Sequence, residues 1–225
     1  MTVSRGAART LVVVAKAPRI GHVKTRLGGT LAPEAIVALY RCLIEDTLDL
    51  AGSLPGTHVA VVCPPADVAE LRAWLDPITE IVAQEGHGLA AALDSTFRIF
   101  VGDGVDRVVI FNGDSPHLPS AELERAFALL DRCDLAVGPT VDGGFYLVGG
   151  RTHHRGLFEA SRLGTQTALD ALLARAGALG LAVGMTAPWY DVDELHDLAR
   201  LARDLRSAPA SAPRTAALLA QWRLA

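Results

Sequence analysis

The sequence has few cysteines and no excess of positive charge, and these two absences narrow the class of protein. The three cysteines, Cys42, Cys63 and Cys133, are scattered along 225 residues without a Cys-x-x-Cys spacing. A low, odd count of this kind argues against a disulfide framework and is typical of reduced thiols in a cytoplasmic chain. The formal net charge of −4 supplies no basic surface for nucleic acid or an anionic membrane. We therefore expect a cytoplasmic protein that binds neither.

Long apolar runs and the common nucleotide-binding fingerprints are also missing. No stretch approaches the roughly 18 uninterrupted apolar residues that a membrane span requires. No Gly-x-Gly-x-x-Gly sequence occurs, which removes the usual dinucleotide-binding fingerprint. The pair Lys24-Thr25 resembles the end of a phosphate-binding P-loop, but Val23 stands where that motif requires glycine. Any nucleotide site in this chain must therefore be built differently.

Short β-branched runs alternate with segments of helical periodicity, and half of the residues are hydrophobic, enough for a sizeable core. We expect strands at residues 11–15, 57–63, 78–82, 108–111, 135–138, 145–148 and 181–185. We expect helices at residues 35–50, 65–75, 89–100, 120–132, 165–176, 194–205 and 214–224. This alternation predicts an α/β fold with a mainly parallel, mixed sheet and helices on both faces.

The same pattern predicts one Rossmann-like domain at residues 10–206. Residues 1–9 are expected to form a flexible lead-in. Residues 207–213, rich in Pro, Ala and Ser, are expected to form a linker, and the final helix would complete a C-terminal segment at residues 207–225. The sequence does not fix the oligomeric state, and a homodimer stays open.

One buried strand of this fold ends in an acid, Asp114, just after the turn residues Asn112-Gly113. The carboxyl ends of parallel strands meet at one edge of a sheet, where open α/β proteins bind ligands. A carboxylate there, together with nucleotide phosphates, is a common way to hold Mg²⁺ or Mn²⁺. Asp191 and Asp193 are candidates for the second acid, because alternate residues of an extended segment face the same way. The competing interpretations are turn-forming roles for Asp114 and Asp191 and a helix cap for Asp193.

The loop after the first strand concentrates positive charge. It carries Lys16, Arg19, Lys24 and Arg26, with Thr25 among them. Lysine supplies a point charge and arginine a bidentate fork, both suited to phosphate. The alternative is a solvated basic loop, but its place at the ligand-binding edge favours anion binding.

Two glycine-containing segments offer space for a substrate. Asp142-Gly143-Gly144 forms a turn by its composition alone, so a hairpin is as well supported as a functional role. Gln84 and Gly88 lie in a second chain break, where an amide and open space would suit a base or sugar.

A serine hydrolase is a rival interpretation of the same residues. Gly113-Asp114-Ser115 matches the Gly-Asp-Ser motif of lipase-like serine hydrolases. In that interpretation Ser115 would be the nucleophile and His196 its base. That motif normally follows the first strand, and Pro116 stiffens the turn here. A nucleotide-binding domain without catalytic activity is a further alternative, which the acids at positions 114, 191 and 193 argue against.

Four motifs in order resemble a known family. They are Lys-Ala-Pro-x-x-Gly-x-Val-Lys-Thr-Arg-Leu at 16–27, Gly-Asp-Ser-Pro-x-Leu at 113–118, Gly-Pro-x-x-Asp-Gly-Gly-Phe-Tyr-Leu-Val-Gly at 138–149, and Trp-x-Asp-Val-Asp at 189–193. The chain resembles the rSAM/selenodomain-associated transferases, whose members are usually labelled glycosyltransferases, within the nucleotide-diphospho-sugar transferase superfamily of GT-A-like fold. The run at 88–93 is similar, more distantly, to 2-phospholactate guanylyltransferases, with Ala90 in place of an Asn.

This resemblance implies roles for individual residues. Lys16, Lys24 and Arg26 would contact nucleotide phosphates, and Asp114 would hold the metal with Asp191 or Asp193. The substrate side would be lined by Asp142, Gly143, Gly144 and Tyr146. Asp114, Lys24 and Asp142 are the expected catalytic residues.

The sequence and the resemblance together predict a transferase that depends on Mg²⁺ or Mn²⁺ and uses an activated nucleotide. The first expectation is a glycosyltransferase with a nucleoside-diphosphate-sugar donor and a small-molecule acceptor. The alternative is a nucleotidyltransferase, in which an NTP is attacked by a phosphorylated or carboxylate acceptor and pyrophosphate is released.

Overall fold

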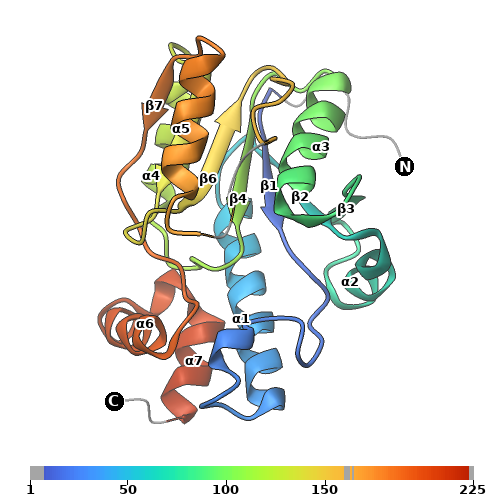
Figure 1. Cartoon of the computed structure of the whole chain (residues 1–225). Coiled ribbons are helices and arrows are strands. Elements are labelled where there is room, and N and C mark those ends of the chain that lie inside the picture. Colours follow the sequence, from blue (N-terminus) through green and yellow to red (C-terminus); the bar gives the residue numbers. More distant parts are fainter. Residues whose placement is uncertain (1–7, 160–162, 164, 223–225) are drawn as a thin grey trace.

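A computed structural model describes residues 8–159, 163 and 165–222 of the chain. Within this part, a seven-stranded sheet has the order β3-β2-β1-β4-β6-β5-β7 (Figure 1). The strands are β1 (Thr10–Val14), β2 (His58–Cys63), β3 (Glu80–Ala83), β4 (Val108–Asn112), β5 (Leu135–Pro139), β6 (Phe145–Gly150) and β7 (Val183–Met185). The helices are α1 (Pro33–Gly52), α2 (Val68–Trp74), α3 (Gly88–Gly102), α4 (Ser120–Leu129), α5 (Ala168–Ala178), α6 (Leu195–Ser207) and α7 (Pro213–Gln221). Single 3₁₀ turns are η1 (Thr25–Leu27), η2 (Pro65–Asp67) and η3 (Pro209–Ser211).

The sheet is mainly parallel, as predicted. β1 pairs in parallel with β2 and β4, β2 with β3, and β5 with β7. Only β6 runs the other way among these strands, and it lies between β4 and β5. Because of this reversal, its first residue, Phe145, lies at the same edge of the sheet as the carboxyl ends of the other strands. The α/β fold class predicted from the alternating pattern is confirmed.

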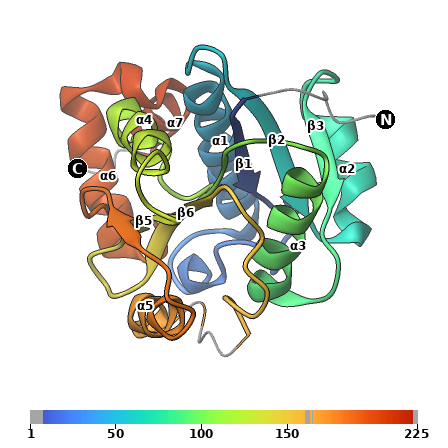
Figure 2. The same ribbon diagram turned by 90° about the horizontal axis from the view of Figure 1, so that it is seen from above.

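Helices cover both faces of the sheet, as Figures 1 and 2 show. α1, α2 and α4 contribute to the core on one face, which includes Ile44, Leu71 and Phe127. α3 and α5 bury Phe97 and Leu172 on the other. Because helices cover both faces of the sheet, the β-branched side chains of the strands are buried on both sides. In β1, for example, four of five residues are buried.

A third apolar cluster lies at the carboxyl edge of the sheet. It joins α1, α6 and α7 through side chains such as Leu39, Leu198 and Leu219. Asp46, in the middle of α1, is 2% exposed. It accepts hydrogen bonds from the backbone N–H groups of Arg214 (3.1 Å) and Thr215 (2.8 Å) in the first turn of α7. The segment after residue 207 therefore continues the packed domain, where a linker was expected.

Element boundaries differ from the prediction by a few residues. α5 begins at Ala168, later than expected, and α4 ends at Leu129. Arg9, assigned to the lead-in, is held by Thr57 and Glu124 through its guanidinium; residues 1–7 of that lead-in lie outside the described part. No helix in the part of the chain that the structure covers combines the length and apolar character needed to cross a membrane.

Candidate active site

The loop after β1 is fastened to the domain by two buried side chains. Tyr40 of α1 accepts a hydrogen bond from the backbone N–H of Lys16 through its hydroxyl (2.8 Å). Asp67 accepts one from the backbone N–H of Ala17 through Oδ2 (3.0 Å). Burial raises the pKa of the Tyr40 hydroxyl, which keeps it protonated. These contacts fix where the loop leaves the strand and where its basic side chains begin.

Arg19 is one of the predicted phosphate-binding residues, and the structure places it elsewhere. Its guanidinium lies 2.7 Å from Asp67 and 2.7 Å from Glu70, on the side of α2. The hydrogen bond with Glu70, followed by the charges of Asp67 and Glu70, raises the pKa of Arg19 despite partial desolvation. Arg19 therefore anchors the loop in this structure, and its contact with phosphate stays a prediction.

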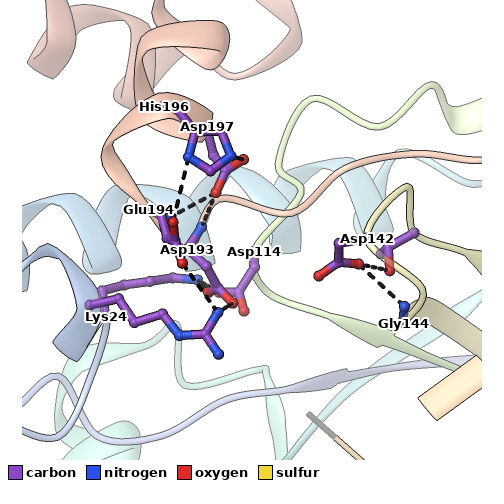
Figure 3. Close-up of polar contacts among 10 residues, drawn as sticks. Lys24, Asp114, Asp142, Gly144, Asp193, Glu194, His196 and Asp197 are labelled. Atoms are coloured by element: carbon purple, nitrogen blue, oxygen red, sulfur yellow. Dashed lines mark hydrogen bonds and ion pairs between the residues drawn. The ribbon is translucent and has the colours of Figure 1, made fainter. Parts of the chain in front are cut away.

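Lys24 is buried between two acids. It is the only non-glycine residue with positive φ in the described part of the chain (φ 44°), immediately before η1. Its side chain is 4% exposed, and Nζ lies 2.7 Å from Asp114 Oδ1 and 2.9 Å from Asp193 Oδ1 (Figure 3). Burial disfavours the charged ammonium, but the charges of Asp114 and Asp193 outweigh it, so the pKa of Lys24 lies above its usual value. Lys24 thus joins the acids, where direct phosphate contact was predicted.

The acid pair and the strand-end acid come together from distant parts of the chain. Asp114 follows β4, and the backbone N–H of Val192 donates to the Asp114 carbonyl (3.1 Å). Val192 is fully buried, so Asp191 and Asp193 on either side of it face the opposite way, toward the site. Asp193 does not cap α6, because Glu194 takes that position in a capping box with Asp197. The helix-cap interpretation of Asp193 is wrong, and its carboxylate remains available to the site.

The charge at this point is predominantly negative. Burial, followed by the charges of Asp114, Asp193 and Asp142, raises the pKa of Asp191 to about 7. Asp193 shows the reverse, since Lys24 and Arg26 overcome desolvation and lower its pKa. Such a concentration of hard carboxylate oxygens attracts a cation.

The donor set fits a magnesium or manganese ion that also binds a nucleotide. Within the described residues, no three His, Cys, Asp or Glu side chains are arranged to hold a metal ion by themselves. Mg²⁺ characteristically takes one or two carboxylates and completes its shell with substrate phosphates and water. Asp114 with Asp193 or Asp191 supplies that number of carboxylates.

Two cavities meet at these acids. The first has a volume of about 380 Å³ and lies between the loop after β1, the start of α3 and the ends of β4 and β6. The second, of about 790 Å³, lies between the turn after β5 and the segment leading into α6. The residues lining both are Arg26, Leu89, Asn112, Asp114, Phe145 and Asp193. A ligand in each would therefore meet the other beside Asp114.

The cavities collect most of the predicted site residues. The first is lined by Lys16, Lys24, Thr25, Arg26, Asp114, Tyr146 and Asp193. The second is lined by Asp114, Asp142, Gly144, Asp191 and Asp193. The hydroxyl of Tyr146 is engaged with Thr186 at 2.6 Å, so only the rest of that side chain remains for a substrate.

Gln84, Gly88 and Gly143 line neither cavity. Gln84 is 7% exposed and donates through Nε2 to the carbonyls of Gly86 (3.1 Å) and Gly88 (3.4 Å). Its amide therefore supports the loop before α3 in this structure. The sequence had predicted that this amide would bind a base or sugar. Gly143 has φ +91°, and a Cβ there would lie 2.1 Å from the carbonyl oxygen of Gln166. Its role is close backbone packing.

Asp142 has the turn-forming role that was one of its two interpretations. Its Oδ1 accepts hydrogen bonds from the Thr140 hydroxyl (2.5 Å) and the Gly144 N–H (3.2 Å). In Figure 3 the Asp142 side chain lies apart from Asp114, and its carboxylate contacts Gly144. The hairpin is confirmed, and Asp142 still faces the second cavity.

Sequence reasoning missed several residues of the first cavity. His22, Asn112, Phe145 and Leu93 all line it. Asn112 had been interpreted only as a turn residue, but it is the last residue of β4, and its Oδ1 is buried without a hydrogen-bond partner among the described residues. The place of Asn112 at the end of a predicted buried strand, next to Asp114, is the signal in the sequence that could have identified it.

The serine hydrolase interpretation does not survive. Ser115 is 0% exposed, and its hydroxyl donates to the carbonyl of Tyr190 (2.9 Å). The His196 side chain is 77% exposed and lies 3.1 Å from Asp197. A nucleophile needs access to substrate and a base within hydrogen-bond reach, and Ser115 has neither.

Comparisons with known sequences find one matching protein family and a guanylyltransferase relative. The profile of the family described as "Uncharacterized protein conserved in bacteria (DUF2064)" matches residues 47–165. A 2-phospho-L-lactate guanylyltransferase of Methanothermobacter thermautotrophicus is 30% identical over 129 residues, which cover 56% of this chain and 55% of that protein. The chain therefore spans about half the length of this curated relative.

Comparisons with solved structures agree with this picture. A proposed nucleotide-diphospho-sugar transferase from Desulfovibrio desulfuricans G20 superposes with a TM-score of 0.88 at 30% identity, covering 96% of this chain and 95% of that one. A nucleotidyl transferase from Methanothermobacter thermautotrophicus superposes with a TM-score of 0.55 at 16% identity, covering 88% and 99%, and shows the shared fold alone. The narrower resemblance to rSAM-associated transferases stays a prediction.

Proposed function

Because this chain belongs to the DUF2064 family and has the fold of nucleotide-diphospho-sugar transferases, we propose that it is a nucleotidyltransferase. In this reaction an acceptor oxygen attacks the α-phosphorus of an NTP. The new oxygen–phosphorus bond forms as the bond to the β-phosphate oxygen breaks, and pyrophosphate leaves with that electron pair. The similarity to a guanylyltransferase supports nucleotidyl transfer over the glycosyl transfer expected first from the sequence.

The observation that carries this proposal is the meeting of two cavities at Asp114. A transfer reaction requires two substrates to approach each other at one reacting centre. The first cavity carries the cations and hydroxyl suited to phosphates, in Lys16, His22, Thr25 and Arg26. The lining of the second includes six acids and the turn after β5. We assign the nucleotide to the first cavity and the acceptor to the second.

In this proposal, basic residues neutralise the leaving pyrophosphate and acidic residues hold the metal. Lys16 and Arg26 would neutralise the departing pyrophosphate, since charge that develops in the transition state is stabilised by fixed opposite charges. Asp114, with Asp193 or Asp191, would hold Mg²⁺ or Mn²⁺, which when bound polarises the phosphate oxygens. The buried strand end and the Val192 N–H hold Asp114 in place before any substrate binds.

A product assay tests this proposal. The protein is incubated with each of the four NTPs and, separately, with nucleotide sugars, in the presence of Mg²⁺ and a panel of hydroxyl, phosphate and carboxylate acceptors. Pyrophosphate released only with an NTP and an acceptor would support nucleotidyl transfer. Release of a nucleoside diphosphate from a nucleotide sugar would instead support glycosyl transfer.

Thermal-shift screening is the first step, because a ligand that binds only the folded protein raises its melting temperature. The same two ligand sets are screened with and without Mg²⁺. Stabilisation by neither set, at millimolar concentrations, would contradict the assignment of the first cavity to a nucleotide.

A further inference from the structure

The amino group of Lys24 lies between two carboxylates to which a divalent cation could bind. It bridges Asp114 and Asp193, at 2.7 Å and 2.9 Å, and these are the carboxylates to which we assign the metal. The 4% exposure of the Lys24 side chain means that water contributes little to its solvation. A divalent cation that binds the Oδ1 atoms of both carboxylates would therefore displace a buried ammonium group.

Displacement is costly unless Lys24 finds another partner. A buried ammonium without a counter-charge is strongly unfavourable, so the amino group will not leave the acids for an empty cavity. Lys24 also lines the first cavity, which we assign to the nucleotide. Phosphate oxygens there would supply new negative partners for an amino group on a flexible four-carbon stem.

We infer that Lys24 couples the binding of metal and nucleotide. The divalent cation binds the two carboxylates tightly only when nucleotide phosphates accept the Lys24 amino group. This inference rests on the proposed function, because it needs a nucleotide in the first cavity. Thermodynamic linkage then requires the metal to tighten nucleotide binding by the same factor, which for coupled sites is typically about 5- to 150-fold.

The neighbouring cations differ from Lys24 in ways that supply controls. Arg26 lies 3.5 Å from Asp193 but is 58% exposed, so water can solvate it when the metal arrives. Lys16 lines the same cavity, and its amino group forms no ion pair within the described residues. Among the described residues only Lys24 bridges both acids, so its removal should free the proposed metal site.

The test measures Mn²⁺ binding to the full chain by electron paramagnetic resonance, with and without a non-hydrolysable NTP. In the wild-type protein the nucleotide should tighten Mn²⁺ binding by about 5-fold or more. In Lys24→Met, Mn²⁺ should bind more tightly than to wild type without nucleotide, and added nucleotide should tighten its binding by a smaller factor than in wild type. Lys16→Met is the matched control: it should weaken nucleotide binding but leave nucleotide-free Mn²⁺ affinity at the wild-type value.

The possible results separate the inference from the proposed function. Equal or weaker nucleotide-free Mn²⁺ binding in Lys24→Met would overturn the coupling role, as would a wild-type protein whose Mn²⁺ affinity ignores the nucleotide. Failure of wild type to bind any NTP would instead overturn the proposed function. If Lys24→Met does not fold, Lys24→Gln and the wild-type measurement still decide. A crystal structure with Mn²⁺ and nucleotide must also show the amino group no longer bridging Asp114 and Asp193.

Discussion

The backbone N–H of Val192 donates to the carbonyl of Asp114 at 3.1 Å, which ties the segment before α6 to the end of β4. This bond involves no side-chain chemistry, so it fixes the acids on both segments whatever their protonation. Asp114 and Asp193 thereby approach one ammonium group although they are far apart in the sequence. The first prediction concerns the acid at the end of the strand.

Asp114→Asn should abolish most of the transferase activity and keep the fold. The amide has the same shape but supplies no charge to a cation, so we expect kcat to fall at least about 100-fold, or ~3 kcal/mol in transition-state stabilisation. The side chain is 29% exposed, which limits the structural cost. Steady-state kinetics measure the effect. Asp131→Asn, at a surface acid remote from the cavities, is the control, and an Asp114→Asn enzyme with wild-type kcat would contradict the assignment.

Asp46→Ala should destabilise the domain through α7. The carboxylate is fully buried and accepts two backbone N–H groups at the start of that helix, which would lose their partners. Loss of a buried, charge-assisted cap costs about 2–4 kcal/mol in the free energy of unfolding. Urea denaturation measures it.

Asp49→Ala is the matched control for that measurement. Asp49 pairs with the same Arg214 but is 60% exposed, and an exposed ion pair contributes less than about 1 kcal/mol. Equal losses in the two variants would show that the capping bonds to α7 have no special importance.

His117 should make the protein sensitive to mild acid. Its imidazole is 7% exposed and packs against the rings of Trp189 and Tyr190, and burial lowers its pKa from 6.5 to about 4. Between pH 6.5 and 4, His117 is therefore protonated in the unfolded chain and neutral in the folded chain. Stability is unaffected by this residue above pH 6.5 and falls as the pH drops from 6.5 to 4, by up to about 3 kcal/mol.

His117→Phe should remove this part of the acid sensitivity, because the ring remains and the titrating group is lost. Unfolding free energies at pH 7.5 and pH 4.5 give the comparison. The exposed His87, changed to Gln, is the control. A His117→Phe variant whose stability falls as steeply between these pH values as that of wild type would refute the burial argument.

Gly143→Ala should destabilise, and Gly177→Ala should not. Gly143 has φ +91°, and its new Cβ would collide with the backbone of Gln166, so a loss of about 1–3 kcal/mol is expected. Gly177 lies in α5 with nothing within 4 Å of the added Cβ, and alanine favours the helix by about 0.4–1 kcal/mol. Melting temperatures should therefore move in opposite directions, and a shift of the same sign would count against this packing role.

Local patterns in the sequence were sufficient for the fold but only partly for the site. The run at 108–111 predicts β4 because four apolar residues followed by turn residues are typical of a buried strand and are too few for a helix. Arg19 shows the limit, since its partner Glu70 is set by the packing of α2 against the loop. Lys24 shows it again, because its ion pair with Asp193 depends on an acid brought from far along the chain, which spacing cannot reveal. Asp46 as a cap for α7 is equally non-local.

The reversed direction of β6 has a consequence for how proteins of this fold diversify. The turn that joins β5 to β6 forms a wall of the second cavity, whereas the loop after β1 forms a wall of the first. Insertions or substitutions in that turn would reshape the acceptor's surroundings and leave the phosphate loop, Lys24 and the end of β4 unchanged. Under the proposed function, relatives with this sheet order could change their acceptor while keeping the same donor site.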